Sequence, residues 1–532
     1  MVDVLLIDPK PESCNRELEE NTSLQLLEIE AYLRSRNYST YLINLRKEQI
    51  SPKEAAEKVA KYSPLVIFVW VMYRSLGYSL SFFKELGRVL YGKSLQRPIV
   101  IAAGYAATFS AVDLLEKTSR RELDAILLGE AEESLAEVVR FLHRGTDWKQ
   151  VPGLIYRNIA GHIRRSPRRD LPSTPDKFPM PYRHESRFSS DQWVEIRGSR
   201  GCYHNCSFCN VGAFYGTANG PRWRGYSVSR MLQEIRYLYE KGARRFYFVD
   251  DQFFGPGKEG IERVRRFALS LLDLGLDIEW QIFCRVDNVE REIFQLMRQA
   301  GLTVVNIGIE GGSQTQLDRM NKRQTVSQII QAVDLIRRLG ITLIPSFIMF
   351  DPYVALEEIE ANIKLIKQLD FITYLGPNCT IPFPGTSLTK RMTADDLLDV
   401  QNPIIPDFLP SVRMVNPEVA LLYNVWQSWR SWIDGSFDNL ETKLAKAAYA
   451  YQVSASSWLG KELETLYSLA RRLKSLEADY IYSCIRNIRE GSSQGELIAL
   501  RSQYTDAISS IALAVPQEYQ PDLILRKEMS NV

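Results

Sequence analysis

The sequence lacks long apolar runs, a leader-like start and a rich supply of cysteine. No stretch of about 18 apolar residues occurs, which is the length that a membrane-spanning helix needs, so we expect no membrane span. Residues 1–8 carry no basic segment and no long apolar core, so we expect no signal peptide. Seven cysteines in 532 residues are few and odd in number, which argues against a disulfide framework. These absences together predict a cytoplasmic protein.

An excess of charge of one sign is also missing. The chain has 66 lysines and arginines against 64 aspartates and glutamates, for a net charge of +2. We therefore expect no nucleic-acid partner, because no overall field attracts one. A hydrophobic fraction of 45% and a charged fraction of 24% are typical of a globular protein. The length predicts several domains.

Three cysteines are concentrated in one short segment, residues 199–209. Cys202, Cys206 and Cys209 follow the spacing C-x3-C-x2-C. Three or four residues span at most about 10 to 14 Å, so one loop can place three thiolates around a compact inorganic cluster. Iron–sulfur clusters usually take four cysteines. No fourth one lies nearby, since the others are Cys14, Cys284, Cys379 and Cys484. One iron would therefore stay open for a substrate, as in an unsaturated catalytic zinc site.

A zinc knuckle is the alternative interpretation of this segment. Structural zinc needs four ligands, usually in two separated pairs, and a second pair is absent here. His204 lies inside the loop, where it could hardly complete a tetrahedron. The spacing favours the cluster over zinc.

The segment resembles the signature loop of the radical S-adenosylmethionine (SAM) superfamily, including the aromatic Phe208 before the last cysteine. The resemblance implies that Cys202, Cys206 and Cys209 hold a [4Fe-4S] cluster whose fourth iron chelates SAM. Reductive cleavage of SAM would then give a 5'-deoxyadenosyl radical. It also implies an external electron donor such as flavodoxin or ferredoxin.

The first 148 residues alternate short β-branched runs with amphipathic stretches. This alternation predicts a doubly wound, Rossmann-like parallel sheet, whose ligands bind beyond the carboxyl ends of its strands. The five predicted strands are 2–8, 38–44, 65–71, 99–103 and 124–128.

Small residues follow two of these strands. Gly104 and Ala106 flank Tyr105 after the fourth strand, and Gly129 precedes Glu130 after the fifth. Small residues let a bulky ligand approach the backbone, although each glycine alone is as well explained by a tight turn. The two stretches, AGYAAT and LLGEAEESL, resemble the cobalamin-binding domain of cobalamin-dependent radical SAM enzymes. The resemblance implies that these five residues contact cobalamin.

The pattern departs from that family after the first strand. Many cobalamin domains place a histidine there that coordinates cobalt, and the register from Asp8 puts Lys10 at that position. We therefore expect no histidine ligand from residues 1–148. Tyr73, Arg74 and Tyr105 remain candidates for the lower face of cobalamin.

The middle of the chain predicts a linker and a second α/β domain. Residues 149–190 contain a probable hairpin and a proline-rich passage, which predict a linker. Strand–helix alternation resumes over 191–390, and six βα units are too few for a closed barrel. They predict an open (β/α)6 partial TIM barrel. Its strands are expected at 193–199, 244–250, 278–284, 303–310, 342–350 and 372–381.

Polar residues at the ends of these strands extend the radical SAM resemblance. By that resemblance Glu310 accepts hydrogen bonds from the SAM ribose, and Gly311 lets the backbone approach. Arg285 either pairs with the SAM carboxylate or neutralises Asp287. Asp250 lies near the turn that orients the SAM amino group in many relatives.

The last segment, residues 391–532, predicts a mainly helical domain. Trp426, Trp429 and Trp432 recur at a spacing of three, which is typical of a helix face packed on a core. A cap over the barrel is the alternative interpretation.

The family resemblance predicts a cobalamin-dependent radical SAM enzyme. The leading prediction is a methyltransferase that acts on an unactivated carbon. The alternative keeps both cofactors but catalyses cyclisation, ring contraction or rearrangement. A further alternative is a non-catalytic binding protein with a structural metal. The substrate is expected to be a small molecule or a peptide, and no catalytic residue can be chosen.

Overall fold

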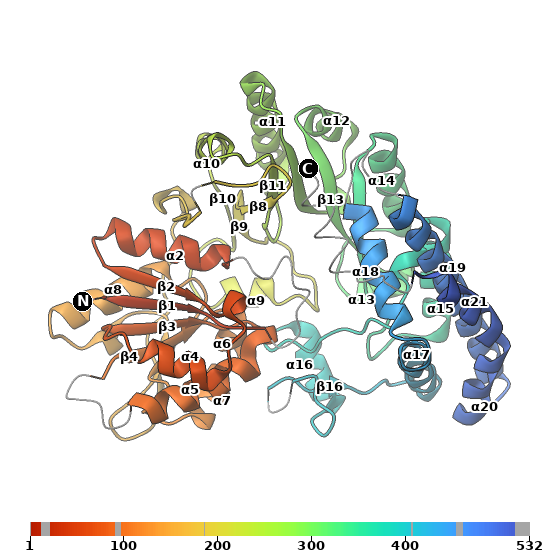
Figure 1. Ribbon diagram of the computed structural model, residues 1–532, viewed down its shortest axis with the longest axis horizontal. Helices are drawn as coiled ribbons and strands as arrows, with labels where there is room; N and C mark the ends of the chain where they lie inside the picture. Colours follow the sequence, from red (N-terminus) through yellow and green to blue (C-terminus); the bar gives the residue numbers. More distant parts are fainter. Residues whose placement is uncertain are drawn as a thin grey trace.

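The computed structural model describes residues 2–11, 22–90, 97–185, 187–405, 408–453 and 461–516. Cys14 lies outside the described residues. Figure 1 shows two α/β units side by side, with the helices of the last segment packed against the second unit. The strands of the first unit point toward the middle of the molecule.

The first unit is the predicted parallel sheet. Its strand order is β2-β1-β3-β4-β5-β6-β7, and the first five strands run parallel. These are β1 (Val4–Asp8), β2 (Thr40–Asn44), β3 (Val66–Trp70), β4 (Ile99–Ala103) and β5 (Ala125–Leu127). Strands β1 and β3 are apolar along nearly their whole length because helices cover both faces of the sheet.

The predicted hairpin is present and joins this sheet. Strands β6 (Leu154–Arg157) and β7 (Ile163–Arg165) add to β5 in antiparallel orientation. Helices α2 and α8 pack on one face of the sheet, and α4, α5 and α7 pack on the other. The helices are α2 (Leu24–Ser35), α3 (Leu45–Glu48), α4 (Pro52–Val59), α5 (Leu76–Leu90), α6 (Tyr105–Phe109), α7 (Ala111–Lys117) and α8 (Glu132–His143).

The second unit is an open parallel sheet in the order β14-β13-β12-β11-β8. Its strands are β8 (Trp193–Ile196), β11 (Arg245–Phe248), β12 (Glu279–Arg285), β13 (Leu302–Glu310) and β14 (Thr342–Phe347). The main helices between and after these strands are α10 (Val228–Glu240), α11 (Gly257–Leu274), α12 (Arg291–Gln299), α14 (Val326–Arg338) and α15 (Leu356–Gln368). Shorter elements between them are β9 (Ser199–Gly201), α9 (Val211–Tyr215), β10 (Trp223–Gly225) and α13 (Gln314–Arg319).

The expected sixth strand at 372–381 is wrong. A short 3-10 helix, η5 (Ile372–Tyr374), takes its first residues. Only an isolated bridge between Phe350 and Cys379 remains at the position of a sixth strand. Pro377 has no backbone N–H to donate and restricts the residue before it, so regular pairing cannot extend through this stretch.

The last segment is mainly helical, as predicted. Trp426 and Trp429 are fully buried, and the Trp426 ring lies 5.6 Å from that of Phe350, just past β14. The tryptophan stripe is therefore a packed helix face. No described helix is both long and apolar enough to cross a membrane. The elements are α16 (Ser387–Ala394), β15 (Leu398–Asp399), β16 (Ser411–Val412), α17 (Pro417–Ser436), α18 (Leu440–Val453), α19 (Lys461–Arg489), α20 (Gln494–Ala499) and α21 (Thr505–Ala514).

A buried ion cluster joins the two units. The Arg200 guanidinium, 1% exposed, lies 2.7 Å from Glu132 and 3.2 Å from Glu28, both on helices of the first sheet. Glu130 lies 3.3 Å from Arg200 and also pairs with Arg224 on β10. Arg200 stands two residues before the first cysteine of the loop, so this cluster holds that loop against the first sheet.

We expect Arg200→Ala to destabilise the protein by about 3–5 kcal/mol, because it leaves buried carboxylates without a partner. Urea unfolding followed by circular dichroism measures the loss. Arg338→Ala is the control, because its pair with Asp334 is exposed and contributes about 0–1 kcal/mol. A shift no larger than that of the control would contradict the prediction.

Candidate active site

The cysteine loop lies at the carboxyl end of the second sheet, where partial barrels collect their sites. Cys202, Cys206 and Cys209 are all partly exposed. Burial raises the pKa of the Cys202 thiol to about 11 and that of Cys209 to about 12. The backbone N–H of His204 points at the Cys202 Sγ at 3.5 Å. The thiols therefore need a bound cation to be held as thiolates at neutral pH.

Backbone hydrogen bonds fix this loop between two distant segments. The Ser207 N–H donates to the Met320 carbonyl at 2.9 Å, and the Ser207 carbonyl accepts from the Leu388 N–H at 2.9 Å. The Asn321 Nδ2 donates to the Asn205 carbonyl at 2.6 Å. The loop is thus held between the segment after α13 and the start of α16.

Gly201, the last residue before the cysteines, has a backbone that only glycine accepts at this point. Its φ is 80°, and it pairs with Trp223 between β9 and β10. A Cβ atom at this position would lie 1.9 Å from the Arg222 carbonyl oxygen. The close approach of β10 therefore requires glycine before the first cysteine.

Asp250, predicted near the SAM amino group, is fully buried after β11. Its carboxylate accepts hydrogen bonds from the Gly198 N–H at 2.9 Å and from the Ser199 hydroxyl. Burial raises its pKa to about 6. Both carboxylate oxygens are thus used in hydrogen bonds to residues of the chain. These bonds hold the segment that leads into the cysteine loop.

Glu310 ends β13 in a strained conformation, with a φ of 68°. Its Oε1 lies 3.2 Å from the Lys322 Nζ, and its Oε2 accepts from the Ser346 hydroxyl at 3.0 Å. A non-glycine residue with positive φ is costly and concentrates at functional sites. Gly311 follows, and a Cβ there would lie 2.7 Å from Gln316. This turn packs too tightly for any larger residue.

Arg285 contacts both the cysteine loop and its own turn. Its Nε donates to Asp287 at 2.9 Å, and its Nη1 lies 3.4 Å from the Cys206 Sγ. Two roles were expected for Arg285, and these contacts show its ion pair with Asp287. Phe208 is partly buried within the loop.

Tyr105 brings the first sheet to this site. Its ring stacks on Phe214 of α9, with centroids 4.0 Å apart and planes 11° apart. Its hydroxyl lies 3.5 Å from the Asp251 carboxylate, just past β11. The loop after β4 therefore meets both the helix that follows the cysteines and the end of a barrel strand.

Protein atoms, not open space, surround the two glycines that were expected to admit cobalamin. A Cβ at Gly104 would lie 2.5 Å from the Val71 carbonyl oxygen, and one at Gly129 would lie 2.7 Å from the Thr217 hydroxyl. Ala106 is fully buried. Packing is thus one reason for small residues at these positions, and their contact with cobalamin stays a prediction.

Tyr73, near this edge, has a buried hydroxyl without a hydrogen-bond partner among the described residues, and its ring lies 5.0 Å from that of Phe383. Ordered water or a bound ligand satisfies such a group. Glu130 is less available, because it already pairs with Arg200 and Arg224.

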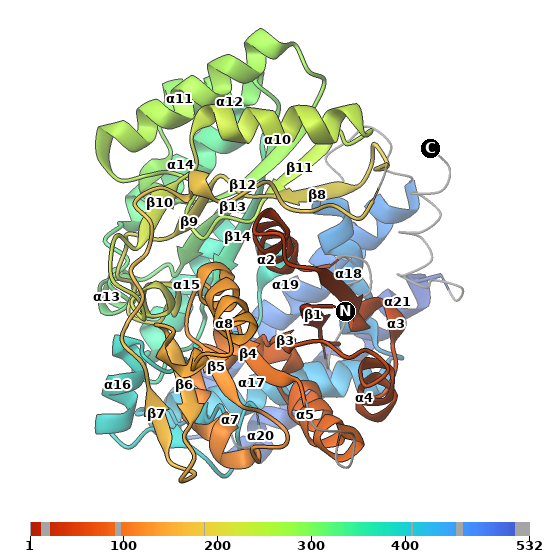
Figure 2. The same ribbon diagram turned by 90° about the vertical axis from the view of Figure 1, so that its left-hand side faces the viewer.

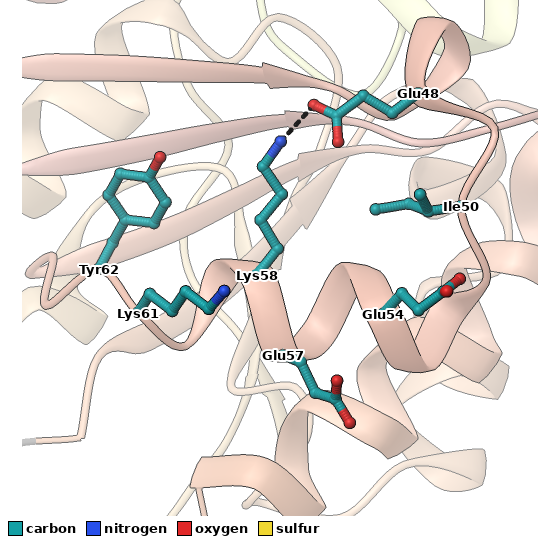
Figure 3. A pocket seen from close by; sticks show the side chains of 7 residues that line it. All are labelled: Glu48, Ile50, Glu54, Glu57, Lys58, Lys61 and Tyr62. Carbon is teal, nitrogen blue, oxygen red and sulfur yellow. Dashed lines mark hydrogen bonds and ion pairs between the residues drawn. The ribbon is translucent and has the colours of Figure 1, made fainter.

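A surface hollow elsewhere on the first unit is not part of this site. Figure 3 shows that it is lined by charged side chains along α3 and α4, with an ion pair of 2.6 Å between Lys58 and Glu48. Among the described residues, Tyr62 is the one aromatic residue in its lining, no cysteine lines it, and its predominantly charged lining is unlike the mostly apolar lining of a typical ligand pocket. Its lining residues are Glu48, Ile50, Glu54, Glu57, Lys58, Lys61 and Tyr62.

The cysteine loop fits a cluster better than a single ion. Within the described ranges, no three His, Cys, Asp or Glu side chains converge as the ligands of one metal ion would. Three thiolates that bind different irons of a cuboid cluster need not converge on one point. Arg285 places a positive charge 3.4 Å from the Cys206 Sγ, beside the group that would bind the cluster.

Comparison with protein families identifies this domain. Residues 196–366 match the Radical SAM superfamily. The chain contains a radical SAM domain. The matched region begins in the last residue of β8 and ends in α15, so it contains the cysteine loop and all five strand ends described above.

Curated relatives of this radical SAM protein include enzymes of two kinds. An uncharacterised methyltransferase of Pyrococcus horikoshii is 34% identical over 53% of this chain and 60% of the relative. An anaerobic magnesium-protoporphyrin IX monomethyl ester cyclase of Rubrivivax gelatinosus is 24% identical over 68% of this chain and 65% of the relative. The radical SAM protein thus spans less than two thirds of the length of each.

A solved structure confirms the predicted fold class of the radical SAM protein. The cobalamin-dependent SAM radical enzyme OxsB, with aqua-cobalamin and SAM bound, superposes with a TM-score of 0.76. The match covers 100% of this chain and 80% of OxsB at 17% identity. The sheet of the first unit, the partial barrel and the helical last segment therefore recur together.

We expect Gly201→Ala to lose most of the iron bound after anaerobic reconstitution, because its Cβ would collide with the β10 backbone. Gly257→Ala is the matched control. Gly257 has a φ of 63°, but nothing lies within 4 Å of an added Cβ, so only the backbone strain is shared. Iron and sulfide per chain are measured, with circular dichroism as a check of folding. Equal iron in both variants would contradict the prediction.

Proposed function

We propose that this protein is a cobalamin-dependent radical SAM enzyme that transfers a methyl group to an unactivated carbon of a small-molecule or peptide substrate. One observation carries the proposal: the carboxyl edges of the two sheets meet beside the cysteine loop. Tyr105 makes this contact, through its stack on Phe214 and its hydroxyl beside Asp251. Groups held at these two edges would face each other across a short distance.

Three sets of side chains would hold the cofactors. Cys202, Cys206 and Cys209 would bind a [4Fe-4S] cluster, and the Glu310 turn would take the SAM ribose. The loops after β3, β4 and β5 would hold cobalamin, with the Tyr73 hydroxyl, which has no partner among the described residues, as a polar contact. When bound, the cluster and SAM supply a carbon radical, and cobalamin carries the methyl group.

The chain's own residues position these groups and exclude water. The Lys322 Nζ lies 3.2 Å from the Glu310 carboxylate, so this side chain, which is only 7% exposed, has a cationic partner. Tyr105, Phe214 and Tyr215 fill the space behind the cysteine loop with aromatic rings. A packed aromatic wall keeps solvent hydrogen away from a reactive carbon.

Ring closure or rearrangement is the second candidate, because a cyclase is among the relatives. It would use the same cofactors and the same strand ends. The relative with the higher identity is named a methyltransferase, which favours methyl transfer.

We expect Cys206→Ala to lose the cluster and to reduce cleavage of SAM to 5'-deoxyadenosine by more than about a hundredfold, since no chemical step remains without it. Cys484→Ala is the matched control, because Cys484 is fully buried among the last helices. Iron content, visible absorbance and 5'-deoxyadenosine are measured with dithionite as reductant. A Cys206→Ala variant that keeps full turnover would refute the enzyme proposal.

Methyl-labelled SAM distinguishes the two candidates. For a methyltransferase we expect the reduced holoprotein to move label onto its bound cobalamin, with release of S-adenosylhomocysteine. A cyclase would leave the label in methionine. Liquid chromatography with mass detection follows both products, and label found solely in methionine would favour ring closure.

A further inference from the structure

We propose that the outer face of the cysteine loop is the docking surface for a small acidic protein that delivers single electrons. The surface consists of the exposed Asn205 and three cations around it, Arg222, Arg323 and Lys390, which we call the basic rim. This inference rests on the proposed function, because it requires a redox cluster behind the loop.

Asn205 places the loop within reach of a partner. It is exposed and stands between Cys202 and Cys206, directly before the latter. An electron donor that touches Asn205 would therefore lie one residue from a predicted cluster ligand. The other side of the loop faces the Tyr105 stack and the first sheet, so the Asn205 side is the one left open.

Two arginines of the basic rim are linked to Asn205 by hydrogen bonds. The Arg222 Nη1 donates to the Asn205 side-chain oxygen at 2.6 Å. Asn321 donates to the Asn205 carbonyl at 2.6 Å, and the Arg323 Nε donates to the Asn321 side chain at 3.4 Å. Positive charge thus stands on both sides of the exposed residue.

Lys390 adds a third cation from α16. The Ser207 carbonyl accepts from the Leu388 N–H at 2.9 Å and from the Ser387 hydroxyl at 3.4 Å, which fixes the start of α16 on the loop. Residues three apart share a helix face, so exposed Lys390 lies on the side of Ser387. Figure 2 shows α13, which leads to Arg323, and α16 along the same edge of the molecule.

The basic rim carries charge that the described part of the chain does not neutralise. None of its three cations has a carboxylate within ion-pair distance there, whereas the neighbouring Arg285 and Lys322 are paired. The carboxylates of Asp287 and Asp318 are bonded to Arg285 and Gln314.

The positive charge of the basic rim lies beside the loop that is proposed to hold the cluster. It is complementary to the negative surface of an acidic electron donor. Opposite charges steer two proteins into contact and raise the rate of association, and salt weakens this attraction. The transfer itself is simple: one electron leaves the donor, which is oxidised, and enters the cluster, which is reduced. No atom or proton needs to cross the interface.

The test compares two reductants on two variants of the reconstituted holoprotein. Arg323→Glu with Lys390→Glu reverses the rim. Lys53→Glu with Lys364→Glu is the control, since both lysines are exposed, lie on α4 and α15, and lack a carboxylate partner within the described ranges. Formation of 5'-deoxyadenosine is driven by flavodoxin with its reductase and NADPH, or by dithionite.

We expect the rim variant to lose at least tenfold in the flavodoxin-driven rate and to match the wild type with dithionite. The control variant should match the wild type with both reductants. Added salt should slow the flavodoxin-driven wild type and should not slow the rim variant, because there it screens a repulsion between the acidic donor and the two glutamates. Arg222→Gln removes one charge but keeps a side chain that can hydrogen-bond to Asn205. It should lower the flavodoxin-driven rate by a smaller factor and leave the dithionite-driven rate unchanged.

Three results would overturn the proposal: a flavodoxin-driven rate equal to that of the wild type, an equal loss with dithionite, or an equal loss in the control variant. Failure of the proposed function looks different. In that case the wild type itself would make no 5'-deoxyadenosine with dithionite, whatever the state of the basic rim.

Discussion

The buried pairing of Arg200 with Glu28, Glu130 and Glu132 is the constraint on which the site depends. Charges removed from water are costly, and only close, well-oriented partners compensate for that cost. The two units can therefore meet in few orientations. Because Arg200 stands two residues before Cys202, the same contact that joins the units also aims the cysteine loop.

The consequence is a site made from both sheets, with two unusual backbone positions beside it. Gly201 has a φ of 80°, which glycine adopts without strain and which lets β10 approach closely. Glu310 has a φ of 68° at the end of β13, which is costly for a residue other than glycine and is held by the contacts with Lys322 and Ser346. Tyr105 joins the edges of the two sheets through its contacts with Phe214 and Asp251.

Much of this fold could be predicted from the sequence, because buried strands are apolar throughout and helices follow a 3.6-residue period. Prediction failed at 372–381, where Pro377 interrupts the expected strand. The contacts of Gly104 and Gly129 with cobalamin stay predictions, and their packing against Val71 and Thr217 could not be foreseen because these neighbours are distant in sequence. The cysteine spacing, by contrast, is local. The ion cluster escaped prediction because its members come from α2, α8, β9 and β10, and no local pattern joins them.

The two faces of the cysteine loop differ in charge, and this difference suits opposite tasks. On the inner face the arginines and glutamates are paired and buried, so the space beside the cysteines is dry and electrically balanced. On the outer face, cations surround an exposed asparagine without partners in the described chain. A radical reaction needs a region closed to solvent, whereas electron supply needs a surface open to a partner. Asn205 and Cys206 are adjacent in the sequence. A partner bound at the outer face would therefore lie next to a predicted cluster ligand, while a substrate at the inner face would stay away from solvent.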